Sequence, residues 1–87
     1  MNREKYILFL KETNHTEKSI NSRLACLKKV EKIFQIDIDS IIYDKDKVKH
    51  LLQSLKKQNL DTTNQNLSNA VRKYYTCMTN DVLGKIF

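Results

Sequence analysis

The apolar residues between positions 16 and 34 recur at the spacing of a single helical face. Five of them follow one another at steps of four, three, three and four residues: Ile20, Leu24, Leu27, Val30 and Phe34. That period is typical of an α-helix with one side turned to a core. The opposite side carries lysines and small residues, namely Lys18, Ser22, Ala25, Lys28, Lys29 and Lys32. The pattern therefore predicts an amphipathic helix with one apolar face and one basic face.

The residues before this helix predict a shorter one. Apolar residues at three- and four-residue spacing mark a helix over about 3–12, and Asn2 is a suitable N-cap for it. A polar turn follows over 13–16. Within this turn, Asn14 tolerates a left-handed conformation and Thr16 is a natural N-cap for the next helix.

The segment after Phe34 alternates isoleucine with aspartate over 35–39, a pattern that a β-strand can also produce. The rest of the chain offers no partner strand, so we expect a connector whose isoleucines fill the core: Ile36, Ile38, Ile41 and Ile42. Asp44 then has the position of an N-cap for a third helix. The apolar stripe of that helix consists of Val48, Leu51, Leu52 and Leu55.

A fourth helix is predicted over about 63–78, after a polar link in which Thr62 and Gln65 have the spacing of a capping box. Its inward residues would be Leu67, Ala70, Val71, Tyr74 and Met78. Asn80 falls where the helix would break, and an amphipathic tail follows with Val82, Leu83, Ile86 and Phe87. We therefore expect residues 1–87 to form one all-α domain, a compact four-helix bundle with a short C-terminal helical tail.

The formal net charge is +6, from 16 lysines and arginines against 10 aspartates and glutamates. The excess is concentrated at the start, because residues 1–34 hold eight basic and four acidic residues, a net +4. A basic domain favours polyanions, of which nucleic acid is the commonest. A lysine-rich surface that only keeps a protein in solution has the same charge, so charge alone leaves both interpretations open.

The sequence contains no recognisable combination of residues for catalysis or metal binding. Cys26 and Cys77 have no second pair with which to form a zinc site, and neither histidine has ligand spacing to them. The single glycine, Gly84, cannot make a phosphate-binding loop, and no nucleophile has a recognisable arrangement with a histidine and a carboxylate. The longest apolar run, 6–10, is too short for a signal peptide or a membrane span. We therefore expect a cytoplasmic protein that is not an enzyme and holds no metal or cofactor.

The outer side of the predicted fourth helix combines amides with cations. Asn and Gln side chains can pair bidentately with adenine and Arg with guanine, whereas lysines neutralise phosphates. The same residues are common on any solvated helix. Together with the basic face of the second helix, they indicate two helices presented side by side to DNA. The candidate nucleic-acid-binding residues are Lys18, Ser22, Arg23, Lys28, Lys29, Lys32, Gln65, Asn66, Asn69, Arg72 and Lys73.

Two stretches of the chain have an order that resembles a known family. The first runs from Phe9-Leu10-Lys11 through a turn into the helix that begins at Thr16, and the second ends in Ala70-Val71-Arg72-Lys73-Tyr74-Tyr75. Both are similar to the N-terminal core-binding, SAM-like domain of phage integrases and other tyrosine recombinases. Arg23 stands where that family usually has Tyr, and Glu17 where Pro is frequent.

This resemblance implies a SAM-like bundle whose second and fourth helices face DNA. It implies no strand cleavage, because the chain has no counterpart of the recombinase catalytic domain. We therefore expect a non-catalytic double-stranded DNA-binding domain, either an arm of a larger protein or an accessory factor of a mobile element or phage. The alternative is a small interaction module or inhibitor that docks on another protein, through the basic face or the apolar tail. A homodimer would form through the same tail, with Val82, Leu83, Ile86 and Phe87.

Overall fold

The computed structural model describes residues 1–58 and 66–81, and in these residues the fold is all-α. Four α-helices and one 3-10 turn follow one another as α1 (Arg3–Glu12), α2 (Glu17–Phe34), η1 (Ile38–Ser40), α3 (Lys45–Lys57) and α4 (Asn66–Thr79). The described residues contain no strand, which confirms the predicted fold class. The predicted capping box of Thr62 and Gln65 and the apolar tail over 82–87 lie outside the described residues.

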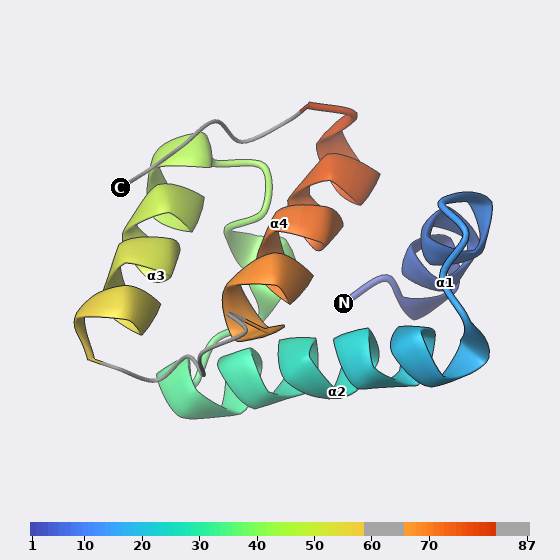
Figure 1. Ribbon diagram of the computed structural model, residues 1–87. Helices are drawn as coiled ribbons and strands as arrows, with labels where there is room; N and C mark the ends of the chain where they lie inside the picture. The colour runs from blue at the N-terminus through green and yellow to red at the C-terminus, as the bar shows by residue number, and fades with distance from the viewer. Residues whose placement is uncertain (59–65, 82–87) are drawn as a thin grey trace.

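The last helix, α4, occupies the centre of the bundle. It contacts α1, α2 and α3, and Figure 1 shows α1 and α3 on its two sides with α2 across its N-terminal end. Its buried residues are Leu67, Ser68, Ala70, Val71, Tyr74, Tyr75 and Cys77. Because three helices pack against α4, no residue of this helix is fully exposed.

Short polar side chains start the first three helices where the sequence predicts them. The side chain of Asn2 accepts the backbone N–H of Lys5 at 3.2 Å, and that of Thr16 accepts the N–H of Ser19 at 3.2 Å. The carboxylate of Asp44 accepts two N–H groups from the first turn of α3. Each cap satisfies donors that have no partner within their own helix, which defines the start of the helix locally.

Three residues with left-handed backbone conformations follow helix ends. Asn14 after α1 has φ of 65° and Asn80 after α4 has φ of 58°, in agreement with the predicted breaks. Gln35 directly after α2 has φ of 52°, a conformation that the sequence pattern did not predict. The N–H of Gln35 donates to the Glu31 carbonyl, so this residue closes the last turn of α2.

The isoleucines of the connector pack into the core, as predicted. Ile38 and Ile42 have no exposed surface, and Ile36 and Ile41 are half-buried against the same cluster. The 3-10 turn at Ile38 excludes a strand here. The N–H of Ile38 donates to the Glu31 carboxylate at 2.9 Å, which attaches the connector to the last turns of α2.

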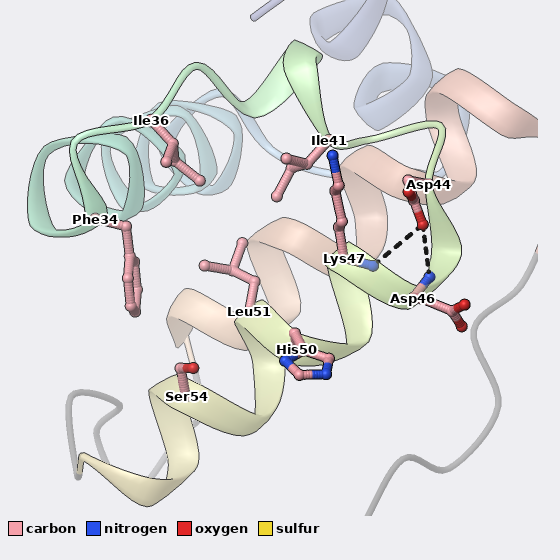
Figure 2. A pocket seen from close by; sticks show the side chains of 9 residues that line it. All are labelled: Phe34, Ile36, Ile41, Asp44, Asp46, Lys47, His50, Leu51 and Ser54. Carbon is pink, nitrogen blue, oxygen red and sulfur yellow. Dashed lines mark hydrogen bonds between the residues drawn. The ribbon is translucent and has the colours of Figure 1, made fainter.

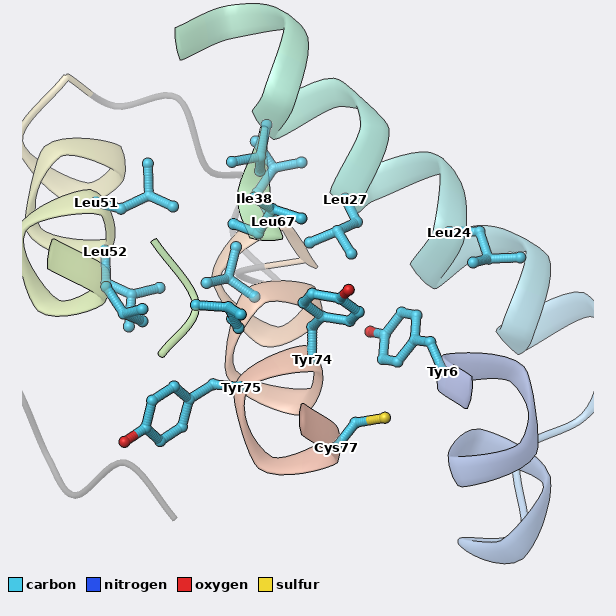
Figure 3. Packing of buried hydrophobic residues seen from close by; sticks show 14 of the residues in the cluster. Tyr6, Leu24, Leu27, Ile38, Leu51, Leu52, Leu67, Tyr74, Tyr75 and Cys77 are labelled. Carbon is cyan, nitrogen blue, oxygen red and sulfur yellow. The ribbon is translucent and has the colours of Figure 1, made fainter. Parts of the chain in front are cut away.

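Two tyrosines join α1 to α4 in the middle of the core, as Figure 3 shows. The rings of Tyr6 and Tyr74 meet edge to face, with centroids 5.2 Å apart and an angle of 86° between their planes. The hydroxyl of Tyr6 donates to the Ala70 carbonyl at 3.0 Å. Of the residues predicted to face inward on the fourth helix, only Met78 is half-buried instead of buried.

Candidate nucleic-acid interface

One side of α2 presents a basic surface to solvent. We call it the lysine face, and it consists of Lys18, Ser22, Ala25, Lys28, Lys29 and Lys32, all of them exposed. At a rise of 1.5 Å per residue, it extends about 21 Å along the helix from Lys18 to Lys32. None of its four lysines forms an ion pair with another residue in the described part of the chain. Their charges are therefore open to an external anion.

The polar residues predicted to form the open side of the fourth helix are half-buried. This holds for Asn66, Asn69, Arg72 and Lys73, whereas Gln65 lies outside the described residues. The reason is the central position of α4, which has a helix on each of several sides. The expectation that these polar side chains are exposed on the fourth helix is therefore wrong.

The lysine face and the polar side of α4 are two separate surfaces. The buried stripe of α2, which faces the core that it shares with α4, consists of Ile20, Leu24, Leu27 and Val30. In a helix of 3.6 residues per turn, the lysine face lies on the side opposite this stripe. A duplex lying on the lysines would therefore not contact α4 from the same side.

Arg23 differs from the other candidate residues of α2, all of which are exposed. It is half-buried at the edge of the apolar stripe, and its positive charge acts on the hydroxyl of Tyr6. Burial raises the pKa of Tyr6, and the charge of Arg23 opposes that shift. Because the Tyr6 hydroxyl donates to Ala70 of α4, Arg23 marks the junction of α1, α2 and α4. It lies on the side of α2 that carries the apolar stripe, opposite the lysine face.

A small groove beside the lysine face adds a residue that the sequence pattern did not single out. Its volume is about 190 Å³, and Arg3, Asn21, Leu24, Ala25 and Lys28 line it. Arg3 opens α1, far from the other candidates in the sequence, and only the folding of α1 against α2 brings it to Lys28. The one feature of the sequence that could have indicated Arg3 is that the first helix begins with a basic residue.

A polar cluster joins the start of the chain to the connector and to α4. The Tyr74 hydroxyl donates to the Asp39 carboxylate and accepts the Asn2 N–H at 2.6 Å. The amino group of Met1 lies 2.9 Å from the same carboxylate. Burial alone would raise the pKa of Asp39, but the hydrogen bonds from Tyr74 and from the amino group bring it below its ordinary value.

Tyr74 itself is held in its neutral form. Burial raises the pKa of its hydroxyl, and the hydrogen bond that it donates to Asp39 raises it further. Its hydroxyl joins the start of the chain and the connector to α4, and we call this cluster the clip.

The cysteines do not form a disulfide or a metal site. Both are free thiols, Cys77 buried and Cys26 half-buried. The Sγ of Cys77 lies 3.6 Å from the Lys5 carbonyl, and burial raises the pKa of this thiol. The described residues contain no group of three or more His, Cys, Asp or Glu side chains placed to hold a metal ion. Over the same residues, no helix combines the length and the apolar character that crossing a bilayer requires.

A mostly apolar groove lies away from the lysine face. Figure 2 shows it between the end of α2, the connector and α3. Its volume is about 570 Å³, and Phe34, Ile36, Ile41 and Leu51 supply its apolar lining. Its polar lining consists of Asp44, Asp46, Lys47, His50 and Ser54.

Comparison with protein-family models, with curated proteins and with solved structures finds no match to this chain. The resemblance to the core-binding domain of tyrosine recombinases thus stays a prediction from the sequence.

Proposed function

We propose that this chain binds double-stranded DNA through the lysine face of α2 and performs no chemistry on it. The observation that carries this proposal is the set of four exposed lysines on one helix face, none paired with a carboxylate of the described residues. Ser22 and Ala25 lie between these lysines and are too small to keep a phosphate backbone at a distance. The net charge of +6 attracts the same polyanion from farther away.

The number of lysines sets the expected salt dependence. Each phosphate neutralised on B-DNA contributes about −0.9 to the slope of log K against log salt concentration. Four lysine–phosphate contacts therefore give a slope of about −3.6. Between 50 and 200 mM salt, affinity should fall about 150-fold.

Two triple variants separate the position of the charges from their number. In the first, Lys28, Lys29 and Lys32 are changed to Gln. In the matched control, Lys45, Lys47 and Lys57 are changed to Gln; these three are exposed on α3. Both variants lower the net charge from +6 to +3. Fluorescence anisotropy with a labelled duplex measures affinity over a range of salt concentrations, and circular dichroism verifies that both variants are folded.

The α2 variant should show a slope of about −0.9, since one lysine contact remains, whereas the control should keep the parental slope of about −3.6. Equal losses in the two variants would mean that only the net charge matters, and the lysine face would then not be the interface.

The burial of the polar side of α4 bears on sequence preference. Phosphate contacts give affinity, and contacts to base edges give sequence specificity. Asn69 and Arg72 are half-buried and lie on a different surface from the lysines. The proposed binding is therefore weakly selective, and duplexes of unrelated sequence should bind within a few-fold of one another. Such a module would suit a DNA clamp of the kind that the recombinase resemblance implies, or an accessory factor of a mobile element or phage.

The apolar groove of Figure 2 supports a second candidate function, docking on another protein. Apolar grooves with a polar rim are common at protein interfaces. A gel-shift assay at about 100 mM salt and light scattering separate the two candidates. Retardation of the duplex by a monomer supports DNA binding, and a stable complex of protein chains without retardation supports docking.

A further inference from the structure

The groove that α1 forms with α2 runs beside the lysine face. Two adjoining hollows make it up and share Asn21. Arg3, Ile7 and Lys11 line it from α1 at steps of four residues, so a single side of α1 forms one wall. The groove therefore has two ends, one at Arg3 and one at Lys11.

The two ends differ in charge. Arg3 and Lys28 line the first end together, and no carboxylate lines it. Neither of these cations forms an ion pair within the described residues. At the other end, Glu17 lines the groove together with Lys11, so the positive charge there is balanced. Two like charges facing one small groove repel each other, and an anion between them removes that repulsion. Only the Arg3–Lys28 end is therefore suited to an anion.

The shape and donors of this end fit one phosphate group. Its volume of about 190 Å³ is below the range of about 300–1,000 Å³ that is typical of small-molecule pockets, which favours a single anionic group. Arginine offers a planar fork of donors that matches two phosphate oxygens. The Asn21 side chain lines the same hollow as a further donor, and the methyl group of Ala25 leaves room for close approach.

We propose that the Arg3–Lys28 end of this groove seats one phosphate of a DNA backbone, with Arg3 of α1 and Lys28 of α2 as the two cations that hold it. The seat rests on the proposed function, because its phosphate belongs to the duplex that lies along the lysine face. It extends the interface from one helix to two.

Two single variants with the same change of charge test the seat. Arg3→Gln removes a cation of the seat. Lys11→Gln removes an exposed cation from the same side of α1, at the end of the groove that Glu17 balances. Arg3→Gln should lower duplex affinity about tenfold at 100 mM salt but change the salt slope little, because Lys28 still neutralises the same phosphate. Lys11→Gln should change affinity less than twofold.

The pair of Arg3 and Lys28 should also act as a unit. Because both hold the same phosphate, the loss in the Arg3→Gln/Lys28→Gln double variant should be smaller than the product of the two single losses. Losses that multiply would place the two residues on different phosphates and overturn the seat.

Inorganic phosphate tests whether the groove itself recognises the anion. In the parent protein, titration to millimolar phosphate should shift the backbone NMR signals of Asn21 and Ala25, and Arg3→Gln should abolish these shifts. Shifts that persist in Arg3→Gln would overturn the seat. A duplex that shifts these signals at far lower concentration identifies the nucleic acid backbone, and not free phosphate, as the natural source; equal potency of the two would contradict the proposal.

Different experimental results would contradict the phosphate seat and the proposed function. If Arg3→Gln behaves like Lys11→Gln while the α2 triple variant loses affinity, the seat is wrong and the lysine face stands. If the α2 triple variant also binds like the parent, the lysine face itself is wrong.

Discussion

Replacing Tyr74 with phenylalanine tests the clip that joins three separate parts of the bundle. The substitution removes only the hydroxyl and keeps the ring, which packs edge to face against Tyr6. That hydroxyl donates to Asp39 in the connector and accepts the N–H of Asn2. Tyr74→Phe therefore breaks two long-range hydrogen bonds without creating a cavity in the core.

The expected loss follows from the two bonds and their exposure. A hydrogen bond to a charged group contributes about 1.5–3 kcal/mol to stability. The side chain of Asp39 is 37% exposed, so water can replace part of what its carboxylate loses. We therefore expect the free energy of unfolding to fall by about 1–2 kcal/mol, since Asn2 is an exposed residue as well. In a domain of this size, that loss lowers the melting temperature by about 4–16 °C.

The assay is urea unfolding at neutral pH, followed by circular dichroism, with Tyr43→Phe as the matched control. Tyr43 is 66% exposed and makes no hydrogen bond among the described residues, so the same chemical change there should alter stability by less than about 0.5 kcal/mol. If the two variants unfold at the same urea concentration, the hydroxyl of Tyr74 contributes nothing and the clip is wrong.

Two further predictions concern the same fold. The pKa of Asp39 lies below its ordinary value of 3.8, because its hydrogen bonds outweigh the effect of burial. The stability that Asp39 contributes is therefore present above that value and lost as the pH falls below it. In urea titrations, Asp39→Asn should lose less stability on acidification than the parent protein. Gln35 has φ of 52°, a conformation in which a Cβ atom is unfavourable. Gln35→Gly should therefore raise the free energy of unfolding by about 1 kcal/mol. A melting temperature that is unchanged or lower would contradict this reasoning.

The helix boundaries could be predicted because their causes are local. Asn2, Thr16 and Asp44 each accept an N–H within the next three residues, so a short window of sequence contains both partners of the bond. The apolar period within each segment likewise identifies the residues that turn inward. Local signals of this kind defined the starts of α1, α2 and α3 and the all-α class.

The surroundings of α4 could not be predicted in the same way. Its apolar period identifies Leu67, Val71 and Tyr74 as core residues, but a period does not tell how many helices will cover the remaining sides. The bond between Tyr74 and Asp39 spans 35 residues, and that between Asn2 and Tyr74 spans 72. No pattern within one segment contains both partners of such bonds.

The central position of α4 changes where a DNA surface can lie. A helix that three others cover has little side-chain surface left to enter a groove, whereas α2 is the longest helix and has one whole side in solvent. That side carries the four lysines of the proposed interface, none of them in an ion pair within the described residues. The edge of α1 that carries Arg3 can extend this set of cations, because it shares a groove with Lys28. In the proposed binding mode, the pair α1–α2, and not the pair α2–α4, therefore forms the platform for DNA.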